Sequence, residues 1–253
     1  MRIPALLLLA AFALPAAAAT APAIPPVIAK AVADPSRPPE DVARDANRKP
    51  GETLAFLGLR PGMKVADYIA NSGYFTRLFA DVVGPQGHVY AAELDEIIGF
   101  PNVAKGYADL KAWAAGRPTV TVTTTPIVTS LDFPEKLDLF WIAQNYHDLH
   151  DKFLGPADVP AFNRQVFAAL KPGGLYVVLD HSAAADAPDD VTETLHRIRQ
   201  DRVRREVEAA GFDLVGESHL LANPADPRTK NVFDESIRGK TDQFILKFRR
   251  PKR

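Results

Sequence analysis

The sequence contains no cysteine at all. A disulfide, a thiolate metal site, a cysteine nucleophile and a lipid-bearing cysteine are therefore excluded. An excess of charge of one sign is missing too, because 30 basic and 31 acidic residues leave a formal net charge of −1. A general nucleic-acid-binding protein normally has a basic face. We therefore expect no nucleic-acid partner, and we interpret the basic tail 250–253 as a solvated end.

Long apolar runs are also missing beyond the first residues of the chain. Arg2 precedes an apolar stretch over 5–14, and small residues follow over 17–19. This order is typical of a cleaved secretory signal peptide, 1–19, and the run is too short for a membrane span. We expect a periplasmic or otherwise exported protein with no stable membrane insertion after cleavage.

Two further regions follow the predicted signal peptide. Residues 20–50 are rich in Pro and Ala and show no clear amphipathic period, which predicts a linker or a strap lying over the domain. From 51 to 249, apolar runs alternate with amphipathic segments. Strands are predicted at 64–69, 88–92, 120–124, 137–142, 175–179, 212–221 and 243–248. Helices are predicted at 52–57, 74–82, 103–114, from an N-cap at Asp158 to 170, and at 191–210.

This alternation of strands and helices predicts βαβ units. We therefore expect an α/β fold, a Rossmann-like doubly wound and mostly parallel sheet with helices on both faces. In such sheets ligands bind beyond the carboxyl ends of the strands. Polar residues at strand ends are therefore the first candidates for function.

One strand–turn–helix segment carries the main signal for a bound cofactor. Asp67 lies near the end of the first predicted strand, and Asn71 and Gly73 lie in the turn before the helix. Glu93 closes the next strand, 26 residues after Asp67. This is close to the roughly 20-residue offset of an acidic ribose-binding residue in Rossmann-type folds, where a carboxylate accepts both ribose hydroxyls.

The segment 65–76 resembles motif I of the S-adenosylmethionine (SAM)-dependent methyltransferases. The resemblance implies SAM as the cofactor and gives roles to the residues that match. Asp67 anchors the methionine end, Asn71 and Gly73 form the cradle, and Glu93 holds the ribose. An acidic surround suits a sulfonium better than a phosphate-binding nest does, which separates this site from a nicotinamide site.

The motif departs from its usual form at two places, because it normally has glycine where this chain has Ile69 and Asn71. Asn tolerates a left-handed backbone, whereas a β-branched residue at positive φ is strained. Either Ile69 is extended, or the loop has been reshaped and SAM binds weakly.

The resemblance extends over most of the chain. The run 72–89 is similar to the protein-isoaspartate methyltransferases, and 170–174 before a strand is a second feature of the superfamily. From about 44 to 247 the chain is similar to an exported family of predicted bacterial methyltransferases. The segments that match that family are 44–50, 145–148, 180–181, 196–198, 217–218 and 239–244.

A second group of candidates follows the fourth and fifth strands. In many methyltransferases the loop after the fourth strand contacts the methyl group and the acceptor, which here indicates Asn145, His147 and Asp148. A neutral imidazole at His147 suits general-base work near pH 7, and Asp148 is placed to fix its tautomer. His181 ends the fifth strand at the same edge. The methyl acceptor is expected to be a small molecule or a protein side chain.

Other chemistries fit the sequence less well. Asp180, His181 and Ser182 cannot form a hydrolase triad among themselves, because strand neighbours point to opposite faces and a G-x-S-x-G elbow is missing. Metal binding by His147, His181 and His196 is a further alternative that the sequence does not favour, and no metal site is predicted, since these histidines lack a tight spacing such as H-x-x-x-H.

Two further hypotheses stay open beside methyl transfer. One is a non-catalytic protein that binds SAM, a nucleoside or another small ligand on a methyltransferase scaffold. The other is an interaction module that keeps only the fold. The sequence does not indicate an oligomeric state.

Overall fold

The structure, a computed structural model, describes residues 23–127, 131–155 and 157–252. The predicted signal peptide, 1–19, and Arg253 of the predicted tail lie outside the described residues. Within those described ranges, no helix is both long enough and apolar enough to cross a bilayer.

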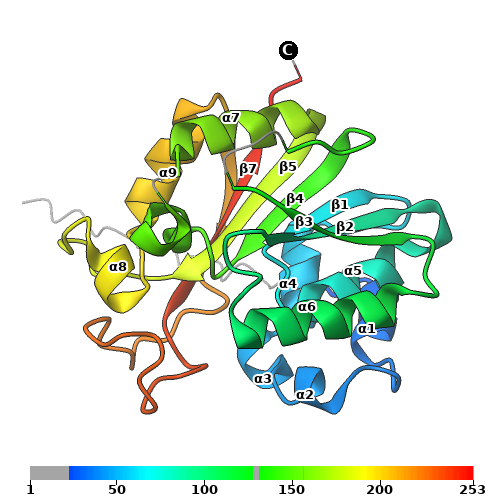
Figure 1. Cartoon of the computed structure of the whole chain (residues 1–253), viewed down its shortest axis with the longest axis horizontal. Coiled ribbons are helices and arrows are strands. Elements are labelled where there is room, and N and C mark those ends of the chain that lie inside the picture. Colours follow the sequence, from blue (N-terminus) through cyan, green and yellow to red (C-terminus); the bar gives the residue numbers. More distant parts are fainter. Residues whose placement is uncertain (1–22, 128–130, 156, 253) are drawn as a thin grey trace, which may run out of the picture.

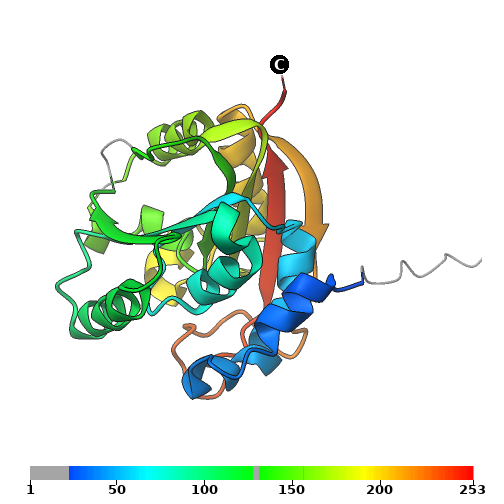
Figure 2. The same cartoon turned by 90° about the vertical axis from the view of Figure 1, so that its right-hand side faces the viewer.

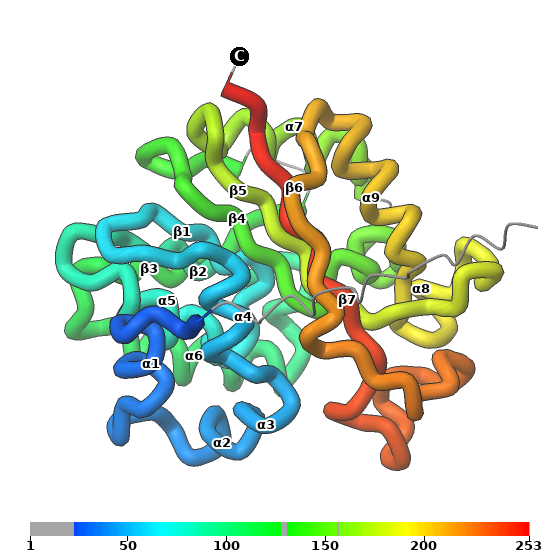
Figure 3. The backbone as a smooth tube through the Cα atoms, turned by 180° about the vertical axis from the view of Figure 1, so that it is seen from behind, coloured from blue at the N-terminus to red at the C-terminus, as the bar shows by residue number. Residues whose placement is uncertain are grey.

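Seven strands form one sheet in the order β3-β2-β1-β4-β5-β7-β6. The first five strands of this order are parallel, and β7 pairs antiparallel with both β5 and β6 (Figure 1). The predicted α/β, mostly parallel, Rossmann-like sheet is therefore confirmed. The strands are β1 (Lys64–Tyr68), β2 (His88–Leu94), β3 (Val120–Thr125), β4 (Leu137–Ala143), β5 (Leu170–His181), β6 (Asp213–Ser218) and β7 (Gln243–Arg249). Figure 3 shows β7 running between β5 and β6.

Alternation along each strand sends side chains to two separate cores. On β1, Val65 packs into the core beside α4 and α5, whereas Ala66 and Tyr68 pack into the core beside α7 and α9. The predicted helices on both faces are thus confirmed. The helices on the first face are α4 (Pro50–Leu57), α5 (Tyr74–Val83) and α6 (Pro101–Ala114), and those on the second are α7 (Val159–Ala169) and α9 (Gln200–Ala209). The predicted N-cap of α7 is confirmed, since Asp158 Oδ1 accepts a hydrogen bond of 2.8 Å from Ala161 N.

The Pro-rich segment before α4 forms three short helices. They are α1 (Pro26–Val32), α2 (Pro39–Val42) and α3 (Asp45–Arg48). Both α1 and α2 begin with a proline, which suits the first helical position because a residue there needs no backbone N–H and proline has none. In Figure 2, α1 (blue) lies against α4 and α5. A buried ion pair of 2.7 Å between Arg77 of α5 and Asp41 of α2 fixes this segment to the domain.

The predicted single helix 191–210 is wrong, because the chain breaks it into α8 (Val191–Leu195) and α9. His196 adopts a left-handed conformation, with φ at 51°, and ends α8. The next residues leave the helix for partners elsewhere in the fold. Arg197 forms a buried ion pair of 2.8 Å with Asp226, and Ile198 exchanges backbone hydrogen bonds with the end of β5. Tertiary contacts thus override the helical period.

Candidate functional site

A cavity of about 650 Å³ lies where β1, β4 and β5 end. This is the edge at which the topology of a doubly wound sheet predicts ligand binding. Its walls come from α3, the turn after β1, the start of α6, the loop after β4, the end of α8 and the loop between β6 and β7. The predicted site residues that line it are Asp67, Asn71, Asn145, His147, Asp148 and His181. Gly73 and Glu93 do not line it.

Backbone strain is concentrated at this cavity. Six non-glycine residues of the described chain have positive φ, and four of them line the cavity. These four are Ile69, Asn71, Gln144 and His196. Sparsely populated backbone conformations persist only where surrounding contacts impose them, and they gather at binding and catalytic sites.

The turn after β1 keeps a tight left-handed path without the usual glycines. Ile69 has φ at 58° and Asn71 has φ at 52°, so the first of the two alternatives for Ile69, an extended backbone, is wrong. Backbone hydrogen bonds from Ala70 N to Ala92 O and from Gly73 N to Ala70 O hold the turn against β2 and close it. The Ile69 side chain is only 4% exposed and packs into the core on the α7 side. Burial of this side chain therefore offsets the strain of its backbone.

Gly73 is required by packing as well as by its backbone conformation. Its φ is 80°, and a Cβ at this position would lie 2.3 Å from Leu110 Cδ1 of α6. This glycine therefore lets α6 approach the start of α5. The cradle role that the family resemblance implies for Gly73 stays a prediction.

Glu93 lies near the end of β2, next to the turn after β1. Asn71 N donates a hydrogen bond of 2.9 Å to its Oε2, and Leu94 N donates one of 3.1 Å to its Oε1. Burial raises the pKa of Glu93 to about 7, although these two amides act in the opposite direction. The carboxylate therefore supports the backbone of the turn, and its predicted contact with a ribose stays a prediction.

Asp67 is the buried carboxyl group that reaches the cavity from β1. Thr76 of α5 donates a hydrogen bond of 2.6 Å from its hydroxyl to Asp67 Oδ2. Burial raises the pKa of Asp67 to about 6, and the influence of Thr76 and Arg48 only partly offsets this effect. Among the described residues, no cationic side chain lies within 4.0 Å of Asp67.

Two arginines of the N-terminal segment line the same cavity, and sequence reasoning did not place them there. Arg48 donates a hydrogen bond of 3.2 Å to Gln144 Oε1, and its guanidinium lies 4.5 Å from the centre of the Tyr74 ring. Arg44 lies 5.6 Å from the centre of that ring. The signal for them was the family resemblance of 44–50, which gave no position in space.

His147 lies between two carboxylates. Its Nδ1 is 2.8 Å from Asp180 Oδ1, and its backbone N donates to Asp180 Oδ2. Its Nε2 is 3.1 Å from Asp148 Oδ1. The partner at Nδ1 is thus Asp180, which sequence reasoning missed, and Asp148 contacts the other ring nitrogen. Burial lowers the pKa of His147, but the two carboxylates outweigh burial and raise it well above its ordinary value.

This arrangement corrects the expected chemistry of His147. An imidazole between two carboxylates keeps its proton near pH 7, so it is not the neutral general base that the sequence suggested. The neutral imidazole of this group is His181, whose pKa burial lowers to about 3. Its Nδ1 is 2.7 Å from the hydroxyl of Thr241. Asn145 instead donates from its amide to Ala143 O, at 2.6 Å.

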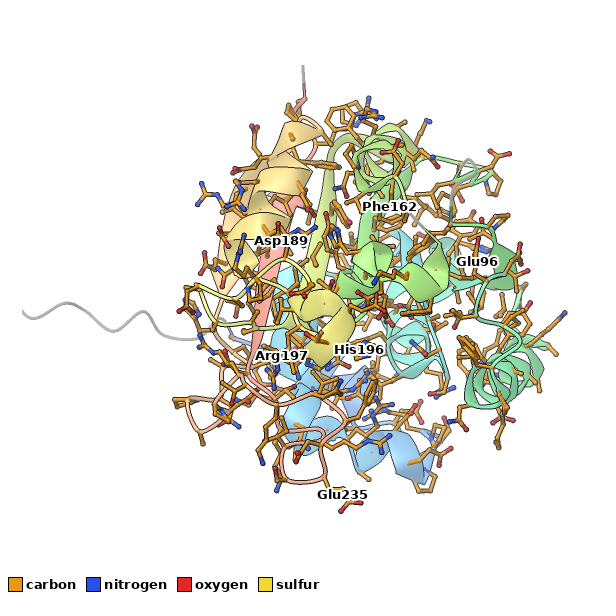
Figure 4. All side chains as sticks on the ribbon, turned by 60° about the vertical axis from the view of Figure 1, so that its left-hand side comes forward. Glu96, Phe162, Asp189, His196, Arg197 and Glu235 are labelled. Atoms are coloured by element: carbon orange, nitrogen blue, oxygen red, sulfur yellow. The ribbon has the colours of Figure 1, made fainter. Side chains whose placement is uncertain are left out.

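His196 joins the same wall of the cavity from α8, where Figure 4 labels it beside Arg197. Its Nδ1 lies 3.6 Å from Asp148 Oδ1 and 3.7 Å from Asp151 Oδ2. The end of α8 and the loop after β4 thus meet at this wall. Sequence reasoning noted His196 but placed it within a long helix, and it did not identify Asp151.

Sequence comparison finds similarity to curated methyltransferases, although no family model matches the chain. The ubiquinone/menaquinone biosynthesis C-methyltransferase UbiE of Shewanella sp. (strain W3-18-1) is 30% identical over 197 residues, which cover 77% of this chain and 67% of that protein. The UbiE of Vibrio campbellii is 27% identical over 195 residues, covering 77% and 64%. The chain spans between about half and two thirds of the length of such relatives.

Comparison with solved structures supports the same architecture. A SAM-dependent methyltransferase from Aquifex aeolicus superposes with a TM-score of 0.56 at 17% identity, covering 84% of this chain and 94% of that one. One from Mesorhizobium loti gives a TM-score of 0.55 at 18% identity, covering 83% and 99%. At these identities the likeness shows the fold.

Proposed function

The chain belongs to the class I SAM-dependent methyltransferases, and on that premise we propose that it transfers a methyl group from SAM to an acceptor bound in the same cavity. The observation that carries the proposal is the buried carboxyl group of Asp67. It reaches the cavity at the carboxyl end of β1 and has no cationic partner within 4.0 Å among the described residues.

The residues of the cavity fit SAM, which carries an ammonium, a sulfonium and a carboxylate. A cationic ligand near Asp67 stabilises the ionised carboxylate that burial disfavours. Arg44 and Arg48 line the same cavity, and their positive charges suit the ligand's carboxylate. Apolar side chains at the start of α6 and in the loop after β4, Phe100 and Phe153, offer faces for the adenine; their ring centres are 6.5 Å apart.

When bound, SAM supplies an electrophilic methyl group on sulfur for in-line displacement by the acceptor. The contribution of the chain is mainly alignment, because such a reaction needs donor and acceptor held in a near-attack geometry. His147, Asp148 and His181 border the cavity on the side of β4 and β5, where they are placed to bind and orient an acceptor. Of these, His181 is the neutral imidazole; with its pKa lowered to about 3 by burial it is too weak a base to take a proton near pH 7, so its contribution is to bind and orient the acceptor by hydrogen bonding.

The acceptor is proposed to be a small molecule or a protein side chain. The relatives are named for the biosynthesis of ubiquinone and menaquinone. A precursor of either quinone is therefore the first acceptor to test.

Calorimetry of the purified protein with SAM and with S-adenosylhomocysteine tests the cofactor site. We expect binding of one equivalent, and a loss of about 10- to 150-fold in affinity for SAM in Asp67→Asn. This range corresponds to the roughly 1.5 to 3 kcal/mol of a hydrogen bond to a charged group. Glu93→Ala should also weaken binding strongly if that carboxylate holds the ribose.

A matched control is Glu96→Gln. Glu96 is exposed just after β2, and its carboxylate accepts a hydrogen bond from Ile127 N outside the cavity. It should bind SAM as the parent protein does. Failure of the parent protein to bind either ligand would refute the proposed cofactor site. Binding of SAM without transfer of labelled methyl to any acceptor would instead favour a ligand-binding protein.

We also propose that the chain is exported and that its signal peptide, 1–19, is removed. The support is the order of charged, apolar and small residues at the start of the sequence. Recovery from the periplasmic fraction with Thr20 as the first residue is the expected result. A chain that keeps Met1 in the cytoplasmic fraction would contradict it.

A further inference from the structure

Two histidines and two aspartates converge at one wall of the cavity. His147, Asp148 and Asp151 come from the 3₁₀ helix η2 (His147–His150) and the residue after it, and His196 comes from the end of α8. One donor atom of each side chain lies within 4.8 Å of those of the other three. The set therefore brings together two imidazole nitrogens and two carboxylate oxygens.

Three of the six distances between these atoms are close to the spacing of ligands around a small divalent cation, and all six lie within 4.8 Å. Tetrahedral ligands at about 2.1 Å from zinc lie roughly 3.4 Å from one another. Here Asp148 Oδ1 is 3.1 Å from His147 Nε2 and 3.6 Å from His196 Nδ1. Asp151 Oδ2 is 3.7 Å from His196 Nδ1. A bound ion thus requires adjustments of only a few tenths of an ångström at these distances.

Asp151 gives an independent indication of a ligand. It is 1% exposed, and neither of its carboxylate oxygens has a hydrogen-bond partner among the described residues. A buried carboxylate without partners is costly, and such groups are normally paired or coordinate metals. This carboxylate faces His196 and the rest of the cluster.

The surroundings of the cluster are those of a metal ligand set. Asp180 holds His147 through Nδ1 and through the backbone amide, which leaves Nε2 directed at Asp148. A carboxylate behind a ligating histidine fixes its tautomer and ring orientation in metal proteins. His196 is held by its left-handed backbone and by the buried Arg197–Asp226 pair that follows it.

We propose that His147, Asp148, Asp151 and His196 form a binding site for a divalent transition-metal cation of the zinc type. The mixed nitrogen and oxygen donors favour such an ion over Mg²⁺ and Ca²⁺, which prefer all-oxygen sites. The ion neutralises the carboxylates of Asp148 and Asp151 and takes the place of the proton between His147 Nε2 and Asp148. Sequence spacing did not indicate this site, because His196 comes from the end of α8, a different element from the one that carries the other three ligands.

The site borders the cavity, since His147, Asp148 and His196 line its wall. A cation there suits an acceptor that binds through a hydroxyl or another oxygen, whose deprotonation the ion favours. This statement about the acceptor rests on the proposed methyl transfer, whereas the metal site itself does not.

Titration calorimetry of the full chain with ZnCl₂ tests the site, using protein purified without a histidine tag, treated with chelator and studied without SAM. We expect one bound equivalent, and at least a 100-fold loss of affinity in Asp151→Asn and in His196→Ala. Asp151→Asn keeps the shape of the side chain and removes an unpartnered charge, so the variant should fold; circular dichroism and thermal melting check this. MgCl₂ should bind far more weakly than ZnCl₂.

Matched controls are His219→Ala and Asp189→Asn, because both side chains are exposed and lie outside the cluster. They should bind Zn²⁺ as the parent protein does. The proposal is overturned if the parent protein binds no Zn²⁺, if both cluster variants bind as tightly as the controls, or if Mg²⁺ binds more tightly than Zn²⁺. If the protein binds Zn²⁺ but not SAM, the metal site stands and the proposed function is refuted. If it binds SAM but not Zn²⁺, the proposed function stands and the metal site is refuted.

Discussion

Replacing Ile69 by glycine and by alanine tests the conformation of the turn after β1. Ile69 has φ at 58°, a region that β-branched residues rarely adopt. Its side chain is also 4% exposed and packed into the core. Strain and burial therefore act in opposite directions at one residue, and the pair of variants separates them.

The magnitudes follow from these two features. Removing a buried isoleucine side chain costs about 2 to 5 kcal/mol, and both variants lose it. Alanine keeps a Cβ and its strain of about 1 to 2 kcal/mol in the left-handed region, whereas glycine relieves it. Glycine in turn costs about 0.5 to 1 kcal/mol more backbone entropy than alanine. Ile69→Gly should therefore be as stable as Ile69→Ala or up to about 1.5 kcal/mol more stable.

Ala70 is the matched control, since it lies in the same turn but does not have a positive φ. There Ala70→Gly should lose about 0.5 to 1 kcal/mol. The free energy of unfolding of the glycine variant minus that of the alanine form should be higher at position 69 than at position 70. The excess should equal the backbone strain alone, about 1 to 2 kcal/mol. Urea unfolding with equal m-values measures all three variants. Equal glycine penalties at the two positions would refute a left-handed Ile69.

Three further predictions follow from buried charged groups. Affinity for S-adenosylhomocysteine should fall as the pH is lowered from about 8 to 5.5. Burial raises the pKa of Glu93 to about 7 and of Asp67 to about 6, so both carboxylates gain a proton over this range and no longer accept hydrogen bonds from the ligand as ionised groups. The contribution of these two groups to the free energy of unfolding of the ligand-free protein should change in the opposite sense. Both folded pKa values lie above the unfolded ones, so the stabilising contribution is fully present below about pH 4 and is lost as the pH rises through 6 and 7. Calorimetry and urea unfolding across this range check both signs, and a pH-independent affinity would contradict the first. Arg197→Leu should lower the free energy of unfolding by about 3 to 5 kcal/mol because it leaves the buried carboxylate of Asp226 unpaired, and a loss below about 1 kcal/mol would contradict this reasoning.

The sheet was predictable from the sequence because local patterns specify it. Apolar runs over 64–69 and 137–142 alternate with amphipathic helices, and the alternation itself implies parallel strands covered on both faces. The break between α8 and α9 was not predictable in this way. It depends on Arg197 pairing with Asp226 and on Ile198 pairing with the end of β5, both contacts between residues far apart in the sequence.

The candidate site was predictable in part for a similar reason. The rule that ligands bind beyond strand ends identified Asp67, His147 and His181, and all three line one cavity. It could not identify the residues that other elements bring there. Arg48 reaches the cavity from a Pro-rich segment without amphipathic period, and Asp151 lies between two short 3₁₀ helices, so neither had a pattern that a single sequence reveals.

The turn after β1 shows why a weak glycine motif need not mean a lost site. Glycine is one way to allow a left-handed backbone; contacts that hold the backbone in place are another. Here the carboxylate of Glu93 accepts the amide of Asn71, and the Ile69 side chain is buried in the core. Glu93 therefore stabilises the turn whether or not it also contacts a ribose. The glycines of the motif are therefore replaced at a turn whose left-handed backbone conformation is retained.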